Sequence, residues 1–357
     1  MPSQLTKLPT FLNRFPTASI HYRWSETLDE VNAIVTKPDE TGEGSGEPPT
    51  WLHWPTPIHD TLFGYEWIIN NLCPSNTQRR DVYVYGSFIG ASLAASLALT
   101  ESHAHQRMAV RGLLAFNGIY NWTTFLPDHP VNKVKTQSIF DTPHRDAEGT
   151  TFHFLKQQIP GLFKSPTNLF DPFASPVLFF HTAGLLVPNS FTDSTVPSSL
   201  LRAIDALSGD AHAEEPTVET AFKTPRKGYL AFPPRQSSLK IPESLLLHEM
   251  PPPISTAGLG FGRRRRSRRV LTAKGEKSGV NNFQTQAEEL AGMMRRSINK
   301  LELKERMKWD EDFDDWDHEA ERRVRTADVG RVEGVGFELS EHGQELAVSW
   351  LEEKMSG

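Results

Sequence analysis

The clearest chemical signal in this chain is a five-residue turn between a predicted strand and a predicted helix. Residues 81–85 are rich in β-forming side chains, and residues 89–99 are small and apolar enough for a buried helix. A sharp glycine turn in this setting presents its central side chain at the top of a sheet, where a serine would act as a nucleophile. The turn consists of Gly86, Ser87, Phe88, Ile89 and Gly90.

Phe88 stands at the centre of this turn. A phenylalanine has neither a proton to lose nor a lone pair with which to attack a carbonyl carbon, so it cannot support covalent acyl transfer. We expect its ring to fill the space above the turn. A bulky side chain at a strained turn costs about 1–3 kcal/mol, so we also expect either a relaxed backbone or a ring that is held by packing.

Further motifs surround the turn. They are Tyr22-Arg23-Trp24, the segment from Trp54 to Asp60 that contains two prolines, Tyr65-Glu-Trp67, and the Leu93-Ala94 pair after the turn. Over about residues 17–125 the chain thus resembles the esterase and lipase branch of the α/β-hydrolase superfamily, and as a whole it resembles uncharacterised fungal members. The resemblance implies a mostly parallel sheet flanked by helices, with Phe88 in place of the nucleophilic serine.

The resemblance also implies positions for the other catalytic groups. Family order places an acid after a strand at 245–247 and a histidine before the last helix, where Glu249 and His342 are the candidates. An exposed loop carboxylate and a helix-capping histidine are the alternative interpretations. The family's oxyanion loop is rich in glycine, but residues 1–18 contain none, so we expect that loop to be missing or severely shortened.

Ser87 and Ser92 are the two hydroxyl groups that could replace the missing nucleophile. In the family's geometry, the residue before the nucleophile faces away from the pocket, and the position of Ser92 packs beneath the turn. Serine hydroxyls in such places commonly bond to the local backbone. We therefore expect local hydrogen bonds for both, and keep a displaced nucleophile as an alternative.

The order of predicted elements favours an α/β fold with a parallel sheet, in a single domain. We expect a strand at 17–24, helices at 57–72, 284–307 and 343–355, and strands at 110–116, 245–247 and 335–339. The core would comprise residues 17–121 and 227–357, with an irregular cap at 122–226. Flexible loops are expected at about 38–50, 251–282 and 308–330. Within the cap, the aromatic run at 170–180 is a candidate lining for an acyl-sized pocket, although core packing explains it equally well.

Composition narrows the classes of function. The net charge is −6, which gives no overall attraction to nucleic acid or anionic membrane, and Cys73 is the only cysteine, which excludes cysteine-rich metal sites. The sequence has no run of 18 uncharged apolar residues and no secretory or mitochondrial leader, so a cytoplasmic location is expected. We expect no cofactor and no metal.

Three functions follow as hypotheses. The first is a non-catalytic pseudoenzyme that keeps an apolar pocket for a small ligand or a protein partner. The second is a serine hydrolase of the carboxylesterase or lipase kind, with a displaced nucleophile. The third is a nuclear or nucleic-acid-associated protein, which rests only on Arg263–Arg269, where six of seven residues are arginine. Residues 310–321 hold eight acidic residues in twelve, so charge pairing within the chain is the favoured explanation of that run.

Overall fold

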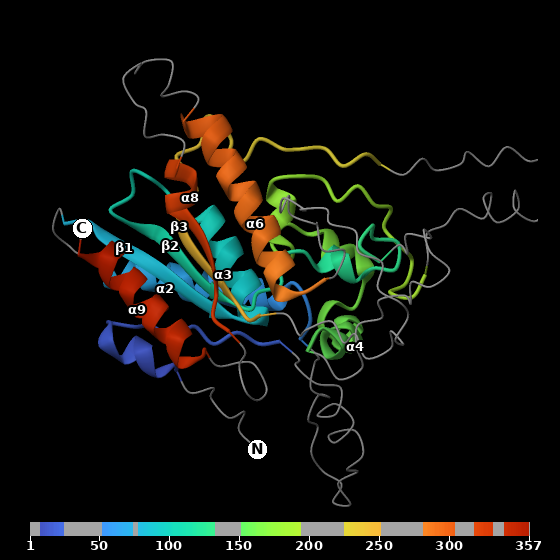
Figure 1. Cartoon of the computed structure of the whole chain (residues 1–357), viewed down its shortest axis with the longest axis horizontal. Coiled ribbons are helices and arrows are strands. Elements are labelled where there is room, and N and C mark those ends of the chain that lie inside the picture. The colour runs from blue at the N-terminus through green and yellow to red at the C-terminus, as the bar shows by residue number, and fades with distance from the viewer. Residues whose placement is uncertain are drawn as a thin grey trace, which may run out of the picture.

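Figure 1 presents the computed structural model of the chain. The structure describes residues 8–24, 52–73, 78–132, 151–193, 225–250, 281–303, 318–330 and 339–356. The arginine run at 263–269 and the predicted loop at 38–50 lie outside the described residues.

A four-stranded parallel sheet forms the centre of the described structure (Figure 1). Its strands are β1 (Arg80–Ser87), β2 (Met108–Phe116), β3 (Glu243–His248) and β4 (Val324–Asp328), and they lie side by side in sequence order. Gly86, Ala115, Leu246 and Thr326 stand at one level across it. Because parallel neighbours need crossover connections, the helices lie on the faces of the sheet. The expected parallel α/β class is confirmed.

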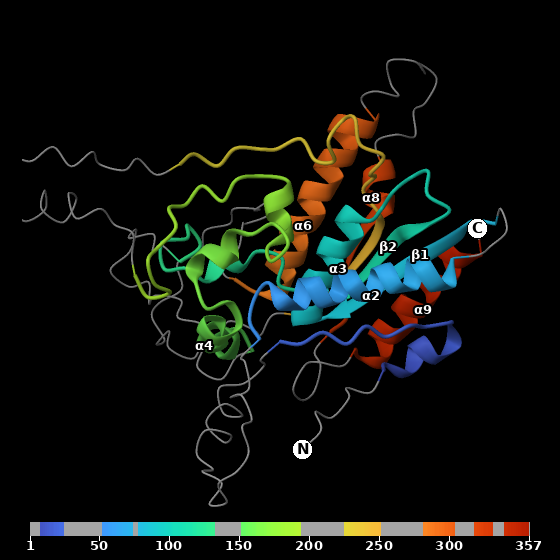
Figure 2. The same ribbon diagram turned by 180° about the vertical axis from the view of Figure 1, so that it is seen from behind.

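Helices cover both faces of the sheet (Figure 2). The helices α2 (Thr56–Leu72), α3 (Ile89–Thr100) and α6 (Phe283–Ser297) share one core with inward side chains such as Val110. On the opposite face, α9 (Glu341–Met355) and the short 3₁₀ helix η1 (Thr10–Arg14) pack against a core that includes Phe116. The small residues of α3 are buried on all sides because this helix lies between the sheet, α2 and the 3₁₀ helix η4 (Pro176–Phe179).

The far edge of the sheet differs from the expectation. Residues 319–328, predicted as part of a flexible loop, form the short helix α8 (Glu319–Arg323) and β4. Of the strand expected at 335–339, only Leu339 is described, and it lies outside any strand. Sequence periodicity missed β4 because Val324 is its only large apolar residue, while Arg325 faces outward and pairs with Glu353 of α9 at 3.1 Å.

The strand expected at 17–24 is also wrong. This segment is not paired as a strand with any described residue. Side chains hold it in place instead: Arg23 makes a two-pronged ion pair with Asp60 of α2 at 2.7 and 2.9 Å, and the indole N–H of Trp24 donates to the Leu162 carbonyl oxygen at 2.9 Å. The hydrogen bond from Arg23 lowers the pKa of the Asp60 carboxyl below its usual value.

The segment after β2 is built from short helices that pack beside the carboxyl end of the sheet. They are the 3₁₀ helix η2 (Trp122–Phe125), the helix α4 (Thr151–Phe163), and the 3₁₀ helices η3 (Pro166–Phe170) and η4 (Pro176–Phe179). After α6, the chain widens into the π-helix η5 (Ile298–Leu303), although a regular helix was expected as far as residue 307. The division into core and cap stays a prediction.

Candidate functional site

The turn between β1 and α3 brings the strand and the helix so close together that it requires glycine. Phe88 links the two elements with φ 53° and ψ −119°, and its N–H donates to the Phe116 carbonyl oxygen at 2.8 Å. A Cβ atom on Gly86 would lie 2.6 Å from the carbonyl oxygen of Gly90, which is too close for any side chain. The strand and the helix can therefore approach this closely only with glycine at position 86.

The Phe88 ring lies in an aromatic cluster. The residue is only 8 % exposed, and its ring meets Phe283, the first residue of α6, edge to face with the centroids 6.1 Å apart. Phe283 in turn packs on Phe152 at 4.7 Å, and Phe152 stacks on Phe125 at 5.6 Å. The predicted filling of the space above the turn is confirmed. Of the two expected outcomes, the structure shows the second: φ of Phe88 stays positive, and its ring is held by packing.

Neither neighbouring serine faces this cluster. Ser92 is fully buried and donates to the Ile89 carbonyl oxygen at 2.8 Å. Ser87 shares a hydrogen bond with the hydroxyl of Tyr85, which lies on the α9 face of the sheet next to Phe11. Burial raises the pKa of Tyr85 to about 12, opposed by that hydrogen bond. The expected bond to the local backbone is confirmed for Ser92, whereas the partner of Ser87 is a side chain.

Glu249 lies at the carboxyl edge of the sheet, directly after β3. Its backbone N–H donates to the side-chain oxygen of Asn117 at 2.9 Å, and Asn117 itself follows β2 with φ 47°. Burial raises the pKa of the Glu249 carboxyl, while a hydrogen bond with Asn117 opposes the rise. The structure therefore places this candidate acid at the same sheet edge as Phe88, with β2 between the two strands that carry them.

His342 is separate from the candidate acid. It is exposed in the first turn of α9, whose N-terminus is capped by Ser340 through a hydrogen bond from the Gly343 N–H at 3.1 Å. Within the described residues, no hydrogen bond or ion pair links His342 to Glu249 or to any other side chain. An acid, a base and a nucleophile in mutual contact are thus not assembled from the predicted residues.

A buried polar cluster on α6 was not predicted from the sequence. Glu289 lies 3.4 Å from the Nε2 atom of His181, which is 1 % exposed, and accepts hydrogen bonds from Asn121 at 3.0 Å and from Lys227 at 3.3 Å. Burial alone would raise the pKa of Glu289, but the contact with His181, the hydrogen bond from Asn121 and the charge of Lys227 lower it to about 2. The cluster joins α6 to the residue before η2, to the chain after η4 and to the segment before β3. Its members are more than 40 residues apart in sequence, so no local pattern could reveal them.

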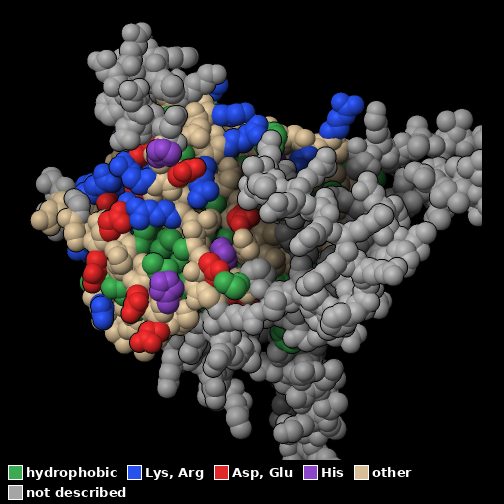
Figure 3. Space-filling model, in the orientation of Figure 1, with side chains coloured by type: hydrophobic (Ala, Val, Ile, Leu, Met, Phe, Trp, Pro, Cys, Tyr) green, Lys and Arg blue, Asp and Glu red, His purple; other side chains and the backbone are tan. Residues whose placement is uncertain are grey.

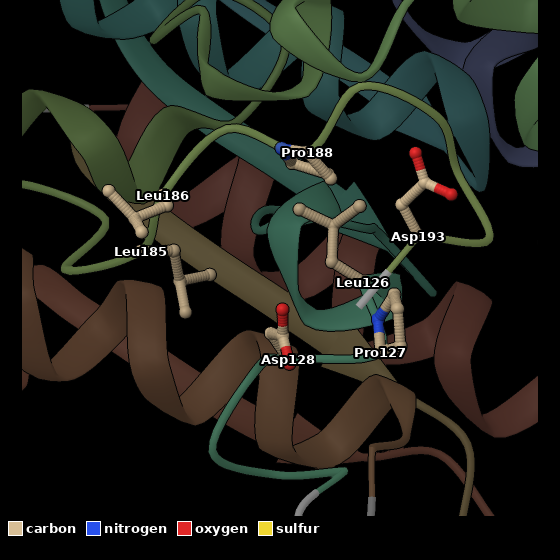
Figure 4. Close-up of a pocket in the computed structure, with 7 residues that line it drawn as sticks. All are labelled: Leu126, Pro127, Asp128, Leu185, Leu186, Pro188 and Asp193. Atoms are coloured by element: carbon tan, nitrogen blue, oxygen red, sulfur yellow. The ribbon is translucent and has the colours of Figure 1, made fainter. Parts of the chain in front are cut away.

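The segment with short helices contains a narrow gap between its connecting chains. Figure 4 shows a narrow gap between the chain after η2 and the chain after η4, and the gap is too small to admit a water molecule. Leu126, Pro127, Asp128, Leu185, Leu186, Pro188 and Asp193 line it. Most of the aromatic run at 170–180 is likewise engaged in packing, as in the contact of Phe173 with Phe179 at 5.5 Å.

Neither a metal site nor a known relative adds a further candidate. Among the described residues, no three His, Cys, Asp or Glu side chains gather in a way that could hold a metal ion. None of the described helices combines the length and the apolar character needed to cross a bilayer. No protein-family model, curated protein or solved structure matches this chain.

Proposed function

We propose that this chain is a catalytically inactive protein of α/β-hydrolase architecture, which acts by binding rather than by hydrolysis. The observation that carries the proposal is Phe88, which keeps a positive φ of 53° while its ring is buried among aromatic side chains. A positive φ at a bulky residue is costly and persists only where the surroundings fix it. A hydrolase fold that has lost its catalytic activity would be expected to keep this strained turn without its nucleophile.

The arrangement of the sheet supports the hydrolase part of the proposal. The strand before the turn is followed by three parallel strands that are added one after another on the same side. The helix after the turn lies on one face, and the last helix, α9, lies on the other. The N-terminal motifs are joined by the ion pair of Arg23 with Asp60, so residues that carry the sequence resemblance also meet in space.

The chemistry of the site argues against hydrolysis. The Phe88 ring occupies the position in which a nucleophile would meet a carbonyl carbon, and it cannot form a bond there. Ser87 and Ser92 are held by hydrogen bonds away from the ring. His342 is exposed, without a carboxylate partner among the described residues, so nothing orients it as a general base.

A serine-hydrolase probe tests the proposal directly. We expect the purified protein to resist labelling by a fluorophosphonate and to leave a panel of aryl esters unhydrolysed, while an active serine hydrolase in the same buffer reacts with both. The reason is that Phe88 stands in the place of the nucleophile, and no hydrogen bond links Ser87 or Ser92 to a histidine among the described residues.

The variants Ser87→Ala and His342→Ala address the alternative of a displaced nucleophile. Each should behave like the unmodified chain in both assays, because neither side chain takes part in a reaction. Labelling or ester turnover that disappears in either variant would contradict the pseudoenzyme proposal and establish an active hydrolase.

A further inference from the structure

An open groove lies at the end of α6 that is far from Phe88. It has a volume of about 200 Å³. In Figure 1 it corresponds to the place where the yellow chain before β3 passes beside the end of α6. The residues that line it come from the end of η4, from the segment before β3, and from α6 and η5: Phe180, Tyr229, Leu230, Ala231, Phe232, Met293, Arg296, Ser297, Lys300 and Leu301.

Most of the lining is apolar, and two cations stand within it. The guanidinium carbon of Arg296 lies 3.5 Å from the centre of the Tyr229 ring, which holds this charge against the wall of the groove. Lys300 is exposed one helical turn further along. Neither cation has a carboxylate partner among the described residues, so the groove presents uncompensated positive charge beside an apolar surface.

Basic side chains near the groove behave differently. Figure 3 shows Lys and Arg side chains over α8 and around the end of α6. Arg322, Arg323 and Arg325 each pair with a glutamate, as in the pair of Arg323 with Glu302 at 2.6 Å. The two cations that line the groove are therefore set apart from these neighbours by the lack of a described counter-charge.

The backbone of the groove is also unusual. After Ser297 the regular α-helix changes to the π-helix η5, which supplies Lys300 and Leu301 to the lining. π-helical turns are rare and are found frequently at functional sites. Their presence at the groove is an observation independent of its charge.

We propose that this groove binds a medium-chain alkyl carboxylate, with the chain on the apolar lining and the carboxylate at Arg296 and Lys300. The proposal rests on the binding role proposed above and names its site and ligand class. An apolar cavity of about 150 Å³ is enough to bind benzene, so a groove of 200 Å³ is large enough for part of an alkyl chain. The negative headgroup supplies the charge that the groove lacks.

The site is distinct from the space above Phe88. Phe283, which packs on Phe88, is the first residue of α6, whereas Arg296 and Ser297 are in its last turn. A helix of 15 residues is about 22 Å long, so the two places lie at opposite ends of α6. Binding in the groove would leave the aromatic cluster undisturbed.

Methyl NMR of the full chain, labelled with ¹³C at the methionine methyl groups, tests the proposal. Titration with decanoate should shift the Met293 signal in a saturable way, because Met293 lines the groove. Met294 is fully buried in the core and should shift much less. Decyltrimethylammonium, which has the same chain length and the opposite charge, should bind at least tenfold more weakly. Equal binding of both compounds, or no saturable shift of Met293 with decanoate, would overturn the proposal.

Charge variants sharpen the test. We expect Arg296→Gln and Lys300→Gln each to weaken decanoate binding roughly fivefold, equivalent to about 1 kcal/mol for a partly exposed ion pair. Arg235→Gln is the matched control, since Arg235 is exposed and does not line the groove. A circular dichroism spectrum equal to that of the unmodified chain establishes that each variant is folded. Unchanged affinity in both groove variants would overturn the assignment of the carboxylate.

A space-filling variant gives an independent readout. Ala231→Trp should abolish the Met293 shift by occupying the groove, and retained saturable binding in this variant would overturn the proposed location. The fluorophosphonate assay on the same samples separates the two proposals. Decanoate binding without labelling supports both the groove proposal and the proposal of an inactive protein. An unlabelled chain that does not bind decanoate contradicts only the groove proposal. Labelling contradicts the proposal of an inactive protein.

Discussion

The two ends of α6 differ in whether the space beside them is filled. At the first residue, Phe283 meets Phe88 and closes the space above the turn with aromatic rings. At the last turn, Arg296 and Ser297 border an open groove. A rigid ring cluster excludes water and ligands. An apolar wall beside unpaired cations can instead bind a ligand that has an apolar part and a negative charge. Binding is thus expected where a hydrolase would not bind its substrate.

Between its two ends, α6 is tied to the rest of the molecule by polar contacts. Gln286 accepts hydrogen bonds from the backbone N–H groups of Tyr120 and Asn121 at 3.0 and 2.9 Å. Glu289 adds contacts to His181 and Lys227. These contacts fix the position of α6 relative to the neighbouring segments, and so fix the positions of both its ends.

The closed end should give the largest effect on stability. We expect Phe88→Ala to lower the free energy of unfolding by about 3–4 kcal/mol, because the ring leaves a cavity in a packed cluster and alanine keeps the positive φ. Urea unfolding measures the change. Phe63→Ala is the control, since Phe63 is 69 % exposed and its loss should cost less than about 0.5 kcal/mol.

Glycine at the same position separates the ring from the backbone. Phe88→Gly should be about 1 kcal/mol more stable than Phe88→Ala, because glycine adopts positive φ without steric cost. A loss below 1 kcal/mol for Phe88→Ala, or an alanine variant more stable than the glycine variant, would contradict the description of a strained turn held by packing.

The middle of α6 should give a pH-dependent effect of intermediate size. The pKa of Glu289 is about 2 in the folded protein against a usual value of 4.5. Because the folded-state pKa is the lower one, its contribution of about 3 kcal/mol is complete above pH 4.5 and is lost as the pH falls toward 2. Urea unfolding between pH 6 and pH 3 should show a loss of about 2 kcal/mol from this group, with the remainder lost below pH 3.

A matched pair of variants isolates Glu289 from other acids. Glu289→Gln should flatten this part of the stability profile, whereas Glu288→Gln, at the exposed neighbouring position, should leave it unchanged. If both variants keep the same acid-induced loss, the buried cluster does not tie α6 in the way described.

The open end should give the smallest effect on stability. Arg296→Gln is expected to lower the free energy of unfolding by only about 0.5–1 kcal/mol, because Arg296 has no ion pair among the described residues and loses just its cation–π contact with the exposed Tyr229 ring. The same urea titration measures it. A loss above 1.5 kcal/mol would mean that Arg296 supports the fold, and the contrast between the two ends of α6 would then fail.

Much of the fold could be predicted from local patterns. The buried strands β1, β2 and β3 and the helices α2, α3 and α9 were expected within a few residues, because their apolar side chains follow the periodicity of each element. β4 was not predicted because Val324 is its only large apolar residue, and the π-helix was not predicted because no local pattern separates it from a regular helix. The strand expected at 17–24 failed because strand formation needs a partner, which a single segment cannot specify.

The candidate site was predicted unevenly for the same reason. Glycines at 86 and 90 and the residue between them could be placed on a turn from their types and spacing. Asn117 beside Glu249, and His181 beside Glu289, could not, because each pair joins segments more than 100 residues apart.

The sequence by itself determined what cannot happen at the turn, since the identity of Phe88 removes a nucleophile whatever the fold. Only the tertiary structure decided what replaces it, because Phe152 and Phe283 reach the cluster around the ring from distant parts of the chain. The groove at Arg296 depends in the same way on residues before β3 and at the end of α6. A side chain carries its own reactivity, but whether a space is filled or open depends on neighbours that only folding brings together.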